Sequence, residues 1–124
     1  MPKPEFSCTV SVSYLSEQSQ PTADVYAFAY TVKISNSGDV TAQLVARHWI
    51  VTDARGHSEE VRGLAVVGHQ PLLKPGETFE YTSWTRIATP QGTMRGTFLC
   101  MTEAAQPFDA PVPEFVLSRP EQLH

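Results

Sequence analysis

The residues best suited to binding chemistry lie in one glycine-punctuated segment, Gly63–Gly68. An arginine precedes the segment and a histidine follows it, so charge and imidazole flank its backbone. If the last four amides of the segment converge, with the arginine supplying charge, the chemistry is that of an anion cradle for a small phosphate-containing ligand. The candidate site residues are Arg62, Gly63, Ala65, Val66, Val67, Gly68 and His69.

A purely structural role is the competing interpretation of these glycines. Gly63 and Gly68 would then mark bends between strands while Val66 and Val67 pack inward, because a short glycine pattern is weak outside a defined structural context. The turn Lys74–Gly76 and the alternating strand Thr78–Trp84 follow. They predict that the segment is held on a rigid sheet.

Imidazoles and carboxylates are numerous, but their spacing matches no metal template. His57 and Glu59 would share one face of a strand and offer two ligands, without a third nearby. A solvated polar strand is the favoured interpretation, so no metal site and no cofactor are predicted. The side chains considered are His48, His57, His69, His124, Asp53, Glu59, Glu60 and Glu77.

No catalytic residues are predicted. Thr82 and Ser83 lie in an expected strand rather than on a strained turn, and Cys8 and Cys100 have no activating base visible in the sequence. A nucleotide pyrophosphatase would need a magnesium-binding cluster of carboxylates beside the glycine segment, and only Glu59, Glu60 and Glu77 are candidates.

Alternation of apolar and polar residues with a period of two dominates the chain and predicts strands. With a turn every ten residues or so and no helical spacing, the fold class is all-β: an antiparallel two-sheet sandwich of immunoglobulin or fibronectin type III form, with seven to eight strands. Pro111 and Pro113 confine the last strand to a sheet edge. The expected strands are Phe6–Tyr14, Tyr26–Ile34, Val40–Thr52, Ser58–Arg62, Thr78–Trp84, Met94–Thr102 and Phe108–Leu117.

Length and charge narrow the function classes. The 124 residues suit one domain, 1–124. A net charge of −4 without a basic stripe argues against nucleic acid as a partner. No stretch approaches the ~20 apolar residues of a membrane span, so membrane insertion is not expected. Two cysteines without a signal peptide favour free thiols and a cytoplasmic location.

Six sets of residues carry a family resemblance. The chain resembles the ApaG family, also associated with the name CorD, from about Val25 to its last two residues. The resemblance implies a fibronectin-type sandwich, alone in bacteria or fused to other modules in eukaryotic F-box and polymerase-interacting proteins. It also implies an association with cobalt and magnesium resistance or efflux. The matching residues are Arg47–Ile50 with Thr52–Asp53 and Gly56, Val66–Pro71, Pro75–Glu77, Tyr81–Ser83, Gly92–Gly96 and Val112–Leu117.

The same resemblance implies a G-x-G-x-x-G loop that holds pyrophosphate, and Gly63–Gly68 lacks its middle glycine. Ala65 stands there, and its Cβ restricts both close approach and positive φ. The residues His69-Gln70-Pro71 follow, so no helix N-terminus points free amides at a phosphate.

Two functions from different classes therefore stand side by side. The first is a non-enzymatic binding module that offers loops, apolar residues near Trp84 or an edge strand to an unidentified protein partner or a small anionic ligand. The second is a pyrophosphate- or nucleotide-binding protein, or a hydrolase, that uses the Gly63–Gly68 loop with Arg62 and His69.

Overall fold

The structure is a computed structural model and describes residues 2–120. Strands make up most of the chain, with two single turns of 3₁₀ helix between the first two strands. The strands are β1 (Phe6–Tyr14), β2 (Tyr26–Asn36), β3 (Ala42–Asp53), β4 (Ser58–Leu64), β5 (Leu72–Leu73), β6 (Thr78–Ile87), β7 (Gln91–Thr102) and β8 (Pro107–Ser118), and the turns are η1 (Ser16–Gln18) and η2 (Pro21–Ala23).

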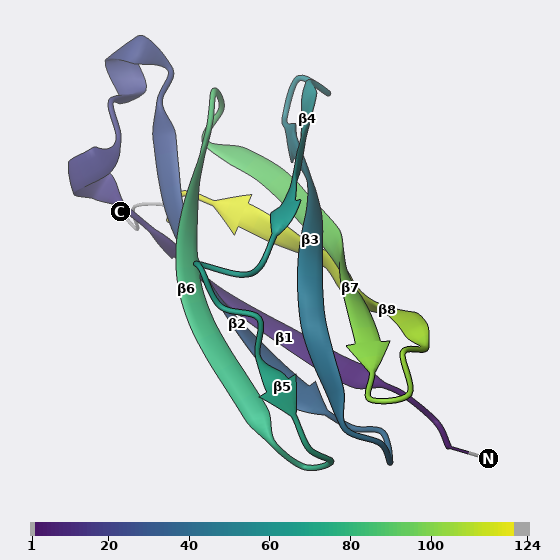
Figure 1. Cartoon of the computed structure of the whole chain (residues 1–124). Coiled ribbons are helices and arrows are strands. Elements are labelled where there is room, and N and C mark those ends of the chain that lie inside the picture. Colours follow the sequence, from purple (N-terminus) through teal and green to yellow (C-terminus); the bar gives the residue numbers. More distant parts are fainter. Residues whose placement is uncertain (1, 121–124) are drawn as a thin grey trace.

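Two antiparallel sheets face each other, which confirms the predicted sandwich (Figure 1). The smaller sheet has the order β1-β2-β6. The larger sheet has the order β4-β3-β7-β8, with β5 pairing β3 beyond the end of β4. β8 is an edge strand, as Pro111 and Pro113 predicted. None of the helical turns in residues 2–120 has the length and apolar character needed to span a membrane.

The core lies where the alternating apolar faces of the two sheets meet. Trp49 in the middle of β3 is 2% exposed, which confirms the expectation that a bulky indole fills this space. Its ring contacts Tyr30, Phe98 and Phe115 at centroid distances of 5.6, 5.6 and 6.2 Å. Gly96 lies beneath the indole, and a Cβ there would overlap the Trp49 ring.

The observed strands and helical turns differ from the predicted ones where the alternation of apolar and polar residues is weak. β4 continues through Gly63 and Leu64, because both residues stay in register with Arg47 and Ala46 of β3. β5 is two residues long and depends on pairing with β3, so it has no alternation of its own to reveal it. The turn at Pro21 was not predicted as helical, and proline presets its first residue.

Candidate functional site

The predicted glycine segment is half strand and half turn. Arg62, Gly63 and Leu64 complete β4, and only the residues after them form a loop. Val66 and His69 close that loop as an isolated bridge: the Val66 N–H donates to His69 O at 2.8 Å, and the His69 N–H donates to Val66 O at 2.9 Å. The Ala65 N–H donates to Val45 O at 2.8 Å.

Left-handed backbone is concentrated in this loop. Ala65 has φ 68°, Val67 φ 49° and Gly68 φ 79°. Ala65 adopts positive φ although its Cβ restricts this region, and the hydrogen bond from its N–H to Val45 O helps to hold it there. Val67 and Gly68 are the two central residues of the turn, and positive φ at both is the mark of a type I′ turn. A β-branched residue at positive φ is strained.

Arg47 shapes the site, although its role was not predicted. Its Nη1 donates to Leu64 O at 2.8 Å and to Ala65 O at 2.9 Å, so the guanidinium fixes the exit from β4. A Cβ on Gly63 would lie 2.9 Å from Arg47 Nη1. Gly63 therefore makes room for a guanidinium. The available signal was that Arg47 shares a strand face with the buried Trp49 and so needs partners inside the sandwich.

The backbone contacts of this loop leave fewer free amides for binding an anion than a phosphate cradle needs. The amides of Ala65 and Val66 donate to backbone carbonyls, and Val66 is fully buried. The Arg62 side chain is 71% exposed on the outer sheet face, with Nη2 3.8 Å from Glu60 Oε2. The His69 ring packs against Phe79 at a centroid distance of 5.6 Å, with the two ring planes tilted by 54°. A phosphate cradle would need two backbone hydrogen bonds to break first.

Binding of pyrophosphate by Gly63–Gly68 stays a prediction, with a direct test. We expect the amide signals of Ala65 and Val66 to stay unmoved in an NMR titration with pyrophosphate, because those donors are occupied. Ala65→Gly is the matched variant: Ala65 is already left-handed in the folded chain, so removing this cost of ~1–2 kcal/mol should stabilise the fold and leave the affinity for pyrophosphate unchanged. Saturable shifts of these two amide signals in either protein would restore the phosphate hypothesis.

The strained turn makes its own prediction. Val67→Asn should raise the free energy of unfolding by about 1 kcal/mol, because Asn-Gly is the preferred central pair of a type I′ turn. For a domain of this size the melting temperature should rise by about 4 °C. Val61→Asn is the control, since Val61 is also exposed but lies in β4. Equal melting of the parent and Val67→Asn would show that the turn is unstrained.

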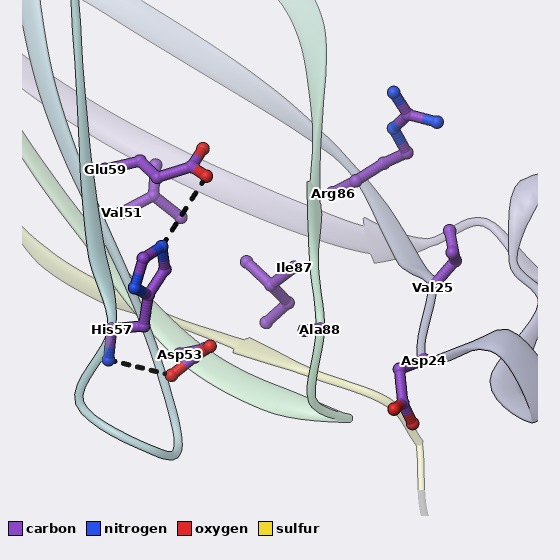
Figure 2. A pocket seen from close by; sticks show the side chains of 9 residues that line it. All are labelled: Asp24, Val25, Val51, Asp53, His57, Glu59, Arg86, Ile87 and Ala88. Carbon is purple, nitrogen blue, oxygen red and sulfur yellow. Dashed lines mark hydrogen bonds and ion pairs between the residues drawn. The ribbon is translucent and has the colours of Figure 1, made fainter.

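A cavity of about 280 Å³ opens at the end of the sandwich where the β3–β4 hairpin faces the end of β6. Figure 2 shows His57 and Glu59 directed toward each other on one side, with Nε2 and Oε1 3.8 Å apart. Asp53 Oδ1 accepts the His57 N–H at 3.0 Å, and Ile87 forms the apolar wall opposite. Arg86 extends away from the His57–Glu59 pair (Figure 2).

Metal ligands do not converge at this cavity. Within residues 2–120, no three His, Cys, Asp or Glu side chains are grouped closely enough to hold a metal ion. His48 Nε2 lies 3.4 Å from Glu60 Oε1 but makes no hydrogen bond with it, and His69 is exposed on its loop. His124 lies outside the described residues.

The two cysteines are free and unsuited to nucleophilic chemistry. Desolvation by burial raises the pKa of Cys8 from 9.0 to about 11 and that of Cys100 from 9.0 to about 12. Both thiols therefore stay protonated at neutral pH, and the thiolate is the reactive form.

The ApaG domain family model matches residues 16–102. The chain belongs to the ApaG family. Protein ApaG of Ralstonia nicotianae is 57% identical over 124 residues, covering 100% of both chains. Protein ApaG of Nitrosospira multiformis is 55% identical over 122 residues, covering 98% of this chain and 96% of the relative. The crystal structure of the ApaA protein from Bordetella pertussis superposes with a TM-score of 0.92 at 51% identity, covering 96% of this chain and 97% of that one.

This ApaG domain carries an apolar surface that sequence reasoning missed. Ala46 of β3 lies directly opposite Leu64 of β4 and Leu99 of β7, which places the three side chains in one row across the sheet. Leu99 stands between the buried Phe98 and Cys100, so this row faces outward. Leu64 is 72% exposed and Leu99 43% exposed.

Proposed function

We propose that this ApaG family chain is a non-enzymatic module that binds a protein partner through the outer face of its larger sheet. The observation that carries the proposal is the row Leu64, Ala46 and Leu99, in which both leucines are exposed and Ala46 is half-buried. Exposed apolar residues that gather on one surface are typical of protein-binding sites. We call this row the outer-face patch.

The surroundings of the patch suit a protein segment better than a reactive substrate. The patch lines an open hollow of about 600 Å³ that also includes His48, Arg62 and Asp109. An apolar centre with charged neighbours is the composition of a protein interface. The expected partner segment is therefore apolar at its middle and offers both an acidic and a basic group at its margins.

A matched pair of variants tests this function. Leu64→Glu combined with Leu99→Glu places two charges in the patch, and recovery of partner proteins from a lysate of the source organism should fall by about tenfold or more. Trp84→Glu is the control, because Trp84 is 58% exposed on the other sheet. Unchanged recovery with the double variant, or loss with Trp84→Glu alone, would contradict the patch as the binding surface.

The cobalt and magnesium association implied by the family resemblance fits the same proposal. We infer that any effect on metal handling passes through the protein partner, because the described carboxylates and imidazoles do not converge.

Calorimetry supplies the corresponding prediction. Titrations of the purified chain with cobalt chloride and with magnesium chloride should give no saturable heat, since a site for either ion needs several converging ligands. His57→Ala is the matched variant, because His57 and Glu59 lie 3.8 Å apart in the cavity that Asp53 also lines. A stoichiometric tight site that His57→Ala removes would overturn the indirect role.

A further inference from the structure

β4 is an exposed edge strand with a defined set of unpaired backbone groups. It pairs with β3 alone among the described residues. The Asp53 N–H donates to His57 O, and the Ala65 N–H donates to Val45 O, one bond at each end of the ladder. Because bonded residues alternate along an antiparallel pair, the odd-numbered residues between these bonds face β3. The even-numbered residues direct their N–H and C=O groups outward, and these are Ser58, Glu60, Arg62 and Leu64.

The other edge of this sheet is protected differently. β8 carries Pro111 and Pro113, which remove N–H donors from its edge. β4 has the sequence Ser-Glu-Glu-Val-Arg-Gly-Leu, with no proline, and its pairing with β3 shows no bulge. An edge strand without proline or a bulge can pair with another strand, and charged side chains such as those of Glu60 and Arg62 restrict that pairing. Its charges then decide which strand it accepts.

The charges of β4 are complementary to those of β4 itself. When two copies lie antiparallel about a twofold axis through Val61, Glu60 of one copy stands opposite Arg62 of the other, and the reverse pair forms as well. Glu60 and Arg62 both belong to the outward-facing set, so each such pair can exchange both main-chain hydrogen bonds. Val61, which is 42% exposed, meets its own copy on the axis.

Neighbouring registers are disfavoured by the same charges. Only registers that oppose even-numbered residues keep the outward donors and acceptors in phase. Moving the axis to Glu60 sets two carboxylates against each other, and moving it to Arg62 sets two guanidinium groups against each other. One register is therefore selected by opposite charge.

We propose that β4 pairs antiparallel with β4 of a second copy of this chain, with the twofold axis at Val61, so that the larger sheets of two protomers become continuous. Within one chain Glu60 Oε2 lies 3.8 Å from Arg62 Nη2, and both side chains are more than half exposed. Each is therefore available to a partner. The contact covers Val61 and places Leu64 opposite Ser58 of the second copy, while Ala46 and Leu99 of the outer-face patch lie on strands outside the contact.

Charge reversal provides the test. The parent protein should dimerise in sedimentation velocity with a dissociation constant between about 1 μM and 1 mM, the range of small transient interfaces. Glu60→Arg alone or Arg62→Glu alone opposes like charges and should weaken the dimer by about tenfold or more. Combining the two changes restores opposite charges and should restore the dimer.

A matched control exists on the other sheet. Lys33 and Glu80 stand directly opposite each other on β2 and β6, and reversal of either should leave the dimer constant unchanged. Circular dichroism reports whether each variant is folded. If a β4 variant fails to fold, dilution NMR of the parent gives an independent readout, in which the amide shifts of Glu60 and Arg62 depend on concentration and those of Lys33 and Glu80 do not.

The contrary results are equally specific. A parent protein that stays monomeric up to about 1 mM overturns the proposal. A dimer that both single reversals leave intact uses another surface. A dimer that the single reversals break and the double reversal fails to restore excludes the register through Val61.

Discussion

Replacing Trp49 with alanine is expected to lower the free energy of unfolding by about 3–5 kcal/mol, a large share of the 5–15 kcal/mol that holds a typical domain. The indole is 2% exposed and meets three aromatic rings, so its removal leaves a cavity between the sheets. Gly96 keeps the backbone of β7 close to the ring and cannot fill that space. Urea denaturation followed by circular dichroism measures the loss.

Two further variants separate packing from polarity at this position. Trp49 Nε1 is buried and has no hydrogen-bond partner among the described residues. Trp49→Phe therefore removes an unsatisfied donor and should cost less than alanine. Trp84→Ala is the exposed control and should change stability by less than about 1 kcal/mol. If Trp49→Ala melts like the parent, the indole does not hold the sheets together.

Strand positions could be predicted because burial on one face imposes a period of two. The alternation around Val10 and Val32 is visible in the sequence, and the two residues lie opposite each other in the β1–β2 pair. β5 could not be predicted, because two residues contain no period. The change in face after Leu44 also escaped prediction, because it follows from a bulge in the β3–β7 register.

The site was harder to predict because its determinants lie on different strands. Gly63 is required by Arg47, and the two residues meet only because β3 and β4 pair in one register. Local propensity argued against positive φ at Ala65 and Val67. Ala65 bonds to Val45, and Val66 bonds to His69. These backbone hydrogen bonds override the local preference for negative φ.

The second large effect is expected at alkaline pH. Burial raises the pKa of Cys100 from 9.0 to about 12 and that of Cys8 from 9.0 to about 11, whereas both thiols ionise near 9 in the unfolded chain. The unfolded state therefore releases protons first, so stability is complete below about pH 9 and falls as pH rises through the folded values. Burial also raises the pKa of Tyr30 and Tyr81, which adds to the loss in the same direction.

The slope with pH gives this prediction its magnitude. Between its unfolded and folded pKa values, each buried thiol lowers the free energy of unfolding by up to about 1.4 kcal/mol per pH unit. Because the contribution of the partly exposed Cys8 is discounted, the expected loss between about pH 9 and pH 11 is roughly 3 kcal/mol. Urea midpoints measured across this range, with a phosphine reductant present, should fall steadily. Cys100→Ala should flatten the slope more than Cys8→Ala, because Cys100 is 0% exposed. A slope equal to the parent's in both variants would mean that other groups, with Tyr30 and Tyr81 foremost, carry the alkaline sensitivity of the core.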